Sequence, residues 1–227
     1  MNNAPLAILD PQDPCSPLAV GPAQTALLLL DFHVFIAKSQ PEDRGPAVIA
    51  AAAALRTWAK ARGILVAHCL IDLRATTPAD RKMAARANAV RDKMQHEAPA
   101  AKGEVPDVAA EAGEYMFYRP PSHVSALGSY GLQTWLEQHG VRSLVLAGFS
   151  TSGCVINTAK GAADAGYVVT LVDDACGDKD SAVHEMITGK LLRGQAHVVQ
   201  SAEFVEAWTR NDGDITAIEE QTGKLAV

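Results

Sequence analysis

The sequence predicts an α/β protein: a single domain of three α/β/α layers around a mostly parallel central sheet. Two observations predict it. Short apolar runs rich in Val, Leu and Ile alternate along the chain with longer segments whose apolar residues recur at helical spacing. The loops between these segments are short, as expected when helices connect parallel strands and cover both faces of a sheet. At 227 residues the chain can form one sizeable core and is short for two.

The elements follow in order along the chain. Five apolar runs have the composition of buried parallel strands, and they cover residues 26–31, 64–71, 143–147, 168–172 and 196–200. Apolar residues at helical spacing predict helices over residues 47–62, 124–139, 154–165 and 181–192. The long polar segment 76–118 interrupts this alternation, and we expect an insertion or lid there with a helix over residues 78–94.

The domain organisation follows from these elements. We expect a Pro-rich N-terminal arm over residues 1–24, one folded domain over residues 25–210 that carries the insertion at about 76–118, and a C-terminal tail over residues 211–227.

Charge and composition restrict the partners. The formal net charge is −6 and no cluster of Lys and Arg is present, which argues against nucleic acid or an anionic membrane as a partner and favours a small molecule. No apolar run approaches the roughly 20 residues of a membrane-spanning helix, and the N-terminus lacks the pattern of a secretory signal. We therefore expect a cytoplasmic protein.

Neither the cysteines nor the glycines predict a cofactor or metal site. The four cysteines show no CxxC or Cys/His metal spacing, so reduced thiols are expected. A dinucleotide-binding G-x-G-x-x-G motif would follow the first strand, but the residues there, Asp31-Phe32-His33-Val34, contain no glycine. We expect no cofactor.

Two residues combine reactive chemistry with a suitable position. Cys154 lies where the apolar run 143–147 gives way to a helical pattern, at a helix start where backbone N–H groups and the helix dipole favour a thiolate. Asp31 ends the first apolar run, so its carboxylate leaves the sheet at the same kind of edge. Sites of open parallel sheets lie at that edge. The plain alternatives are a small buried cysteine and a helix-capping aspartate.

A wider set of residues carries a family resemblance. Asp31, the segment Gly148-Phe149-Ser150-Thr151-Ser152-Gly153-Cys154-Val155-Ile156-Asn157-Thr158-Ala159, and the later segments 162–167 and 172–175 resemble the isochorismatase-like cysteine hydrolase superfamily over about residues 26–204. The resemblance implies a Rossmann-like fold, a dimer or tetramer, and hydrolysis of a C–N bond in an amide, ureide or carbamoyl compound.

The resemblance also implies roles for individual residues. Cys154 would be the nucleophile that forms a thioester acyl-enzyme, and Asp31 the base that takes its proton. The family usually has a cis peptide a few residues before the cysteine, which corresponds here to Phe149–Ser150. The N–H groups of Ser150 and Cys154 would then form the oxyanion hole.

The third catalytic position departs from the family pattern. The family has a lysine after a short strand, whereas this chain has Arg119, and the stretch from Arg119 to Ser125 is about two residues longer than usual. An arginine cannot readily exchange a proton. It could stabilise a thiolate by its charge, clamp a substrate carboxylate, or form a plain ion pair with a carboxylate such as Glu114. His123 is the other candidate proton donor.

Five residues near these positions are candidates to line a substrate pocket: Phe32, His33, Tyr118, His123 and Phe149. Metal-dependent nicotinamidases of the superfamily carry an Asp-x-His set after the second strand. This chain has Asp72-Leu73-Arg74 instead, so we expect neither a metal nor a nicotinamidase.

Two other functions stay open at this point. One is isochorismatase-type cleavage of a vinyl ether, which in this superfamily depends on the aspartate. The other is a catalytically silent binding protein, in which the lysine has been lost.

Overall fold

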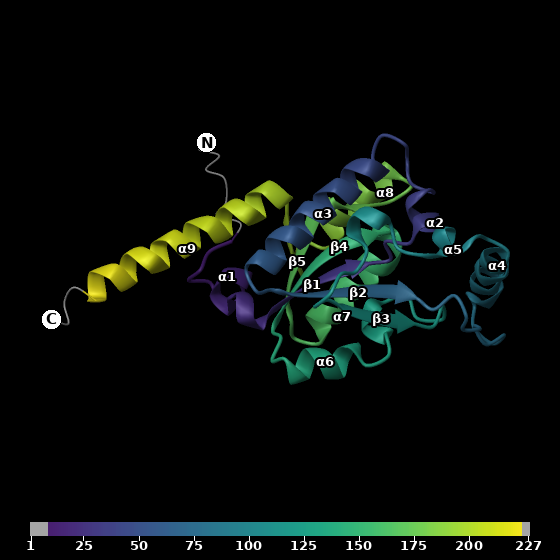
Figure 1. Ribbon diagram of the computed structural model, residues 1–227, viewed down its shortest axis with the longest axis horizontal. Coiled ribbons are helices and arrows are strands. Elements are labelled where there is room, and N and C mark those ends of the chain that lie inside the picture. Colours follow the sequence, from purple (N-terminus) through teal and green to yellow (C-terminus); the bar gives the residue numbers. More distant parts are fainter. Residues whose placement is uncertain (1–8, 224–227) are drawn as a thin grey trace.

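Within residues 9–223, which the computed structural model describes, six parallel strands form one sheet with helices on both faces (Figure 1). The strands lie in the order β3-β2-β1-β4-β5-β6, and every neighbouring pair is parallel. The predicted α/β fold with a parallel central sheet is therefore confirmed. The strands are β1 (Thr25–Leu30), β2 (Leu65–Ile71), β3 (Tyr115–Arg119), β4 (Ser143–Phe149), β5 (Val168–Gly177) and β6 (His197–Val199).

Both faces of the central strands are buried, which explains why their sequences are continuously apolar. Leu27 and Leu29 of β1 belong to the core on one face, and Leu28 and Leu30 to the core on the other. Successive residues of a strand point to opposite faces, so a strand covered on both sides needs an apolar residue at every position.

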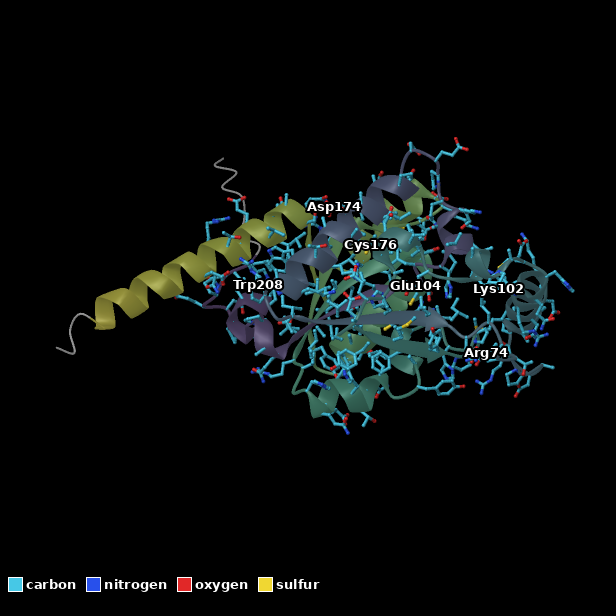
Figure 2. All side chains as sticks on the ribbon, viewed as in Figure 1. Arg74, Lys102, Glu104, Asp174, Cys176 and Trp208 are labelled. Carbon is cyan, nitrogen blue, oxygen red and sulfur yellow. The ribbon has the colours of Figure 1, made fainter. Side chains whose placement is uncertain are left out.

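Helix α3 (Gly45–Ala61) and the beginning of α9 (Ser201–Gly223) cover the first face. Val48 and Leu55 of α3 pack there, and Trp208 of α9, labelled in Figure 2, is 1% exposed with its ring 5.9 Å from that of Trp58. The second face is covered by α6 (Leu132–Gln138), α7 (Ile156–Asp164) and α8 (Ser181–Met186) with the π-helical turn Ile187–Leu191.

Strand β3 is not among the five apolar runs that the sequence analysis identified, and it forms the end of the segment expected to be an insertion. It lies at the edge of the sheet, where Tyr115, Met116 and Tyr118 are more than a third exposed. Because an edge strand does not need the Val/Leu/Ile run of a buried one, its aromatic sequence gave no such signal.

The helix predicted over residues 47–62 is confirmed as α3, whereas the other predicted helices are shorter or less regular than expected. In the segment 124–139, Gly131 has a φ of 78°, so the chain forms a 3₁₀ turn (Ala126–Gly128) and then the short α6. In the segment 154–165, a π-helical turn (Thr151–Val155) precedes α7. The predicted tail contains the continuation of α9 to Gly223.

The segments outside the core pack onto it. In the arm, α1 (Pro17–Val20) and the 3₁₀ turn Pro22–Gln24 lead into β1, and Leu9 and Leu18 join the core. The insertion contains α4 (Ala84–Gln95), α5 (Pro99–Lys102) and the 3₁₀ turn Pro106–Val108, and it faces the short helix α2 (Val34–Ala37). No helix within residues 9–223 has the length and apolar character needed to span a membrane.

Candidate active site

Three of the strands bring the predicted catalytic residues to one edge of the sheet. Asp31 directly follows β1, Arg119 is the last residue of β3, and Cys154 lies in the π-helical turn after β4. Asp31 has a φ of 54°, a left-handed conformation that aspartate tolerates better than most residues. Its N–H donates to the carbonyl of Cys69 at 2.9 Å, which fixes the point where the chain turns away from the sheet.

Arg119 holds Asp31 in a bidentate ion pair. Its Nη1 donates to Oδ1 at 2.8 Å and its Nη2 to Oδ2 at 2.5 Å, while Nε donates to the His123 carbonyl at 2.9 Å. The two side chains are only 3% and 5% exposed. Burial alone would lower the pKa of Arg119, but the electrostatic interactions with Cys154 and Asp31 and the hydrogen bonds to Asp31 outweigh it and raise the pKa. Arg119 therefore stays protonated, and it reaches Asp31 despite the longer stretch that follows it.

Cys154 lies close to both residues but is not a thiolate at rest. It is 3% exposed, and burial raises the pKa of its thiol to about 12, with a further increase from the charge of Asp31. Arg119 and a hydrogen bond from Thr158 lower the pKa and only partly compensate. This differs from the thiolate expected at a helix start, because desolvation outweighs the helix dipole here. A proton acceptor is needed to make the nucleophile.

The loop before Cys154 contains the two N–H groups expected to form an oxyanion hole. The Phe149–Ser150 peptide bond is cis. The carbonyl of Ser150 accepts from Gly153 N–H at 2.9 Å and from Val155 N–H at 3.3 Å. These two bonds use the N–H groups on either side of Cys154 in the sequence and not that of Cys154 itself. Gly153 has non-helical backbone angles inside this turn. The chain thus forms a tight turn, not a regular first turn of helix.

Gly148 allows β4 and β1 to approach each other next to this loop. Its φ is 150°, and a Cβ atom at this position would collide with the carbonyl oxygen of Leu30. Leu30 immediately precedes Asp31. A glycine is therefore required for the cysteine loop and the aspartate to emerge side by side.

The predicted pocket residues divide into three groups. Phe32 and Phe149 are fully buried and pack edge to face with ring centroids 5.1 Å apart, so they belong to the core and do not line a pocket. His123 contributes its carbonyl to Arg119, while its ring lies near Ser122 (Nδ1–Oγ 3.4 Å).

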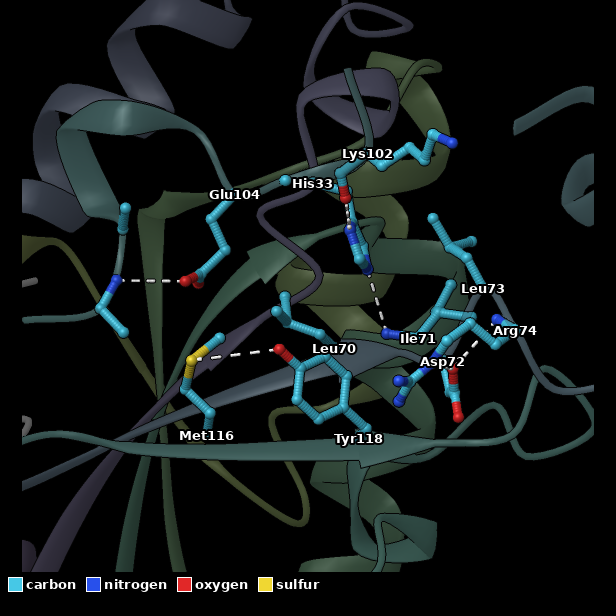
Figure 3. Close-up of a pocket in the computed structure, with 13 residues that line it drawn as sticks. His33, Leu70, Ile71, Asp72, Leu73, Arg74, Lys102, Glu104, Met116 and Tyr118 are labelled. Carbon is cyan, nitrogen blue, oxygen red and sulfur yellow. Dashed lines mark hydrogen bonds and ion pairs between the residues drawn. The ribbon is translucent and has the colours of Figure 1, made fainter. Parts of the chain in front are cut away.

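His33 and Tyr118 do line a cavity, one of about 610 Å³ at the edge of β2 and β3 (Figure 3). Leu70 and Tyr118 are register partners there, and they point to the opposite face from Cys69 and Phe117, which pack in the same core as Cys154. None of the three catalytic candidates lines this cavity. Its other walls include Met116, Arg74, Lys102 and Glu104.

His33 also joins three segments near Asp31. Its Nε2 accepts the Ile71 N–H at 3.0 Å, and its Nδ1 lies 3.3 Å from the carbonyl of Lys102. Burial lowers the pKa of His33, and the opposing effects of Asp31 and Lys102 are smaller. The ring is therefore neutral, with its proton on Nδ1.

Comparison with known protein families identifies the family of this chain. The isochorismatase domain model matches residues 25–203, a range that contains Asp31, Arg119 and Cys154. The chain belongs to the isochorismatase family.

Relatives of this isochorismatase-family chain include enzymes and solved structures. It is 34% identical over 164 residues to maleamate amidohydrolase of Pseudomonas putida, across 70% of this chain and 75% of that protein. It shares its fold with a cysteine hydrolase from Pseudomonas syringae (TM-score 0.66, 16% identity, 84% of this chain and 95% of the other). The fold is also that of N-carbamoylsarcosine amidase from Thermoplasma acidophilum (TM-score 0.61, 19% identity, 78% and 96%).

Sequence analysis of this family member missed the residues that hold the cysteine loop. Thr151 Oγ1 lies 2.8 Å from His184 Nδ1, and His184 Nε2 lies 3.2 Å from Asp173 Oδ1. Asp178 accepts from both the N–H and the hydroxyl of Ser152, at 2.7 and 2.6 Å. The two aspartates lie toward the end of β5 and just after it, so the sheet-edge argument could have identified them. His184 lies in a helix and gave no signal. Across residues 9–212, no group of three or more His, Cys, Asp or Glu side chains is arranged to hold a metal ion.

Proposed function

We propose that this isochorismatase-family protein is an amidohydrolase that cleaves the C–N bond of a small carboxylic acid amide through a thioester on Cys154. One observation carries the proposal: Asp31 shares a buried site with a thiol whose pKa is raised and that needs a base, and a bidentate ion pair with Arg119 holds the Asp31 carboxylate in place. A base beside a cysteine at a sheet edge is the arrangement of a cysteine nucleophile.

In the first half-reaction, Asp31 takes the proton of the Cys154 thiol as Sγ bonds to the carbonyl carbon of the amide. The N–H groups of Ser150 and Cys154 stabilise the oxyanion that forms. When the intermediate collapses, the C–N bond breaks, and Asp31 gives its proton to the leaving nitrogen. An amine or ammonia leaves, and the acyl group remains on the sulfur.

In the second half-reaction, a water molecule attacks the thioester. Asp31 takes a proton from the water and returns it to the sulfur when the C–S bond breaks. The balance is one amide and one water converted to one acid and one amine. Asp31 carries every proton, because an arginine cannot exchange one near neutral pH.

Arg119 acts by its charge in this scheme. Both of its terminal nitrogens contact Asp31, and the positive charge lowers the pKa of Cys154. This geometry supports a role in stabilising Asp31 and the thiolate. It does not favour a clamp for a substrate carboxylate, since Arg119 is already engaged by a carboxylate.

The substrate class rests on the relative that acts on maleamate, the monoamide of a small dicarboxylic acid. The test measures release of ammonia from maleamate and from a set of other small amides and ureides. We expect release by the wild-type protein and none above background by Cys154→Ala, while Cys176→Ala, which removes another buried thiol, stays active. Undiminished amide hydrolysis by Cys154→Ala would contradict the proposal.

A further inference from the structure

Thr158 lies one helical turn after Cys154, and its side chain faces the same way. Residues four apart on a helix are neighbours on its surface. The Thr158 side chain is completely buried, and its Oγ1 is 3.7 Å from Cys154 Sγ, within hydrogen-bonding distance for sulfur. The hydroxyl therefore contacts the atom that the proposed mechanism uses as the nucleophile.

A second contact orients this hydroxyl. The N–H of Ala126 donates to Thr158 Oγ1 at 2.8 Å. A threonine hydroxyl has one hydrogen to donate and two lone pairs that accept. Because Ala126 supplies a donor to the oxygen, the hydroxyl hydrogen is free to point at the sulfur.

Two other threonines in helices, Thr57 and Thr209, bond differently. Thr57 and Thr209 donate to the carbonyl oxygen four residues earlier, at 3.0 and 2.8 Å. That is the usual bond of a threonine inside a helix. For Thr158, the partner four residues earlier is the sulfur of Cys154.

We propose that Thr158 is a further catalytic residue, whose hydroxyl donates a hydrogen bond to Cys154 Sγ and stabilises it as a thiolate. A hydrogen bond to an ionised acceptor is roughly twice as strong as one to a neutral acceptor. The bond therefore favours the thiolate over the thiol, both when the sulfur attacks and when it leaves the thioester. It opposes the effect of burial, which raises the pKa of Cys154.

This inference rests on the proposed function, because it assigns a role in making the Cys154 nucleophile. Its test measures alkylation of Cys154 by iodoacetamide between pH 7 and pH 10, with the modified position read by mass spectrometry. No substrate is needed, so the outcome is independent of which bond the enzyme hydrolyses. Cys15, the exposed cysteine, is an internal reference for the reagent in every sample.

We expect Thr158→Val to react about tenfold more slowly at Cys154, the effect of one lost charge-assisted hydrogen bond. Thr158→Ser restores the hydroxyl and should react within about twofold of wild type. Thr170→Val is the matched control, because it removes another buried hydroxyl, one that lies beside Val145 and not at the carboxyl edge of the sheet, and it should leave the rate unchanged. If Thr158→Val does not fold, Thr158→Ala takes its place beside Thr158→Ser.

A wild-type rate in the variants that lack the hydroxyl would overturn the inference, and so would a serine variant as slow as the valine variant. Turnover adds a second criterion. A residue that stabilises the thiolate lowers kcat with little change in KM, whereas a displaced loop changes both. If Cys154→Ala hydrolyses amides normally, the proposed function fails, and the alkylation rates still decide whether Thr158 supports the thiolate.

Discussion

The ion pair between Asp31 and Arg119 makes a quantitative prediction about stability. Both charges are out of water, with side chains 5% and 3% exposed, and each carboxylate oxygen accepts from one terminal nitrogen of the arginine. Replacing Arg119 by alanine leaves the carboxylate buried without its partner. Breaking a buried pair from one side costs about 3–5 kcal/mol, because the remaining charge keeps its desolvation penalty. Arg119→Ala should therefore lower the free energy of unfolding by about that amount.

Two further variants distinguish the cost of removing one charge of the pair from the cost of removing both charges. Asp31→Asn keeps the shape of the side chain and tolerates the positive φ, but it leaves Arg119 unpaired, so we expect a loss of similar size. The double variant Asp31→Asn/Arg119→Met removes both charges and should lose less than either single variant, since a buried pair replaced as a whole is often near neutral.

The assay is equilibrium unfolding in urea, followed by the fluorescence of the three tryptophans. Arg210→Ala is the control. Arg210 pairs with Glu206 on α9, where the side chains are 72% and 69% exposed, and its loss should cost less than about 1 kcal/mol. If Arg119→Ala is no more destabilising than Arg210→Ala, the buried pair of Asp31 and Arg119 is not tightly coupled.

Two other predictions concern the backbone and the histidine beside the site. Gly148→Ala should destabilise the fold by more than about 3 kcal/mol because its Cβ would collide with Leu30, whereas Gly21→Ala, also at positive φ but in open space, should cost about 1–2 kcal/mol in the same urea assay. Burial lowers the pKa of His33 below 6.5, so the unfolded chain binds this proton more readily and stability falls as the pH drops below about 6.5. His33→Gln should lose less stability than wild type between pH 7 and pH 5; an equal or larger loss would show that burial of His33 is not responsible.

The sequence predicts the central part of the fold well, because β1, β2, β4 and β5 are buried on both faces and must be continuously apolar. It predicts the edges poorly. Strand β3 is half exposed and aromatic, so it lacks the composition of a buried strand. The helices near Gly131 and Cys154 begin differently from the prediction because the backbone forms a local turn at each position. The spacing of apolar residues contains no information about such turns.

The candidate site shows the same division. Asp31 and Cys154 could be paired from sequence because both follow strands of a parallel sheet, which end at one edge. The contact between Arg119 and Asp31 depends on strand order, since β2 lies between their strands. The contacts of Thr158 with the backbone of Ala126 and of His184 with Thr151 join residues about thirty positions apart in sequence, and no local pattern predicts them.

The proposed function requires that Cys154 becomes acylated, and intact-mass spectrometry of rapidly quenched enzyme detects this acyl-enzyme. With an amide that the protein hydrolyses, we expect a transient mass increase equal to the acyl group, located on Cys154 by peptide mapping and absent in Cys154→Ala. Turnover without any adduct in single-turnover samples across the full time course, or an adduct on another residue, would contradict it.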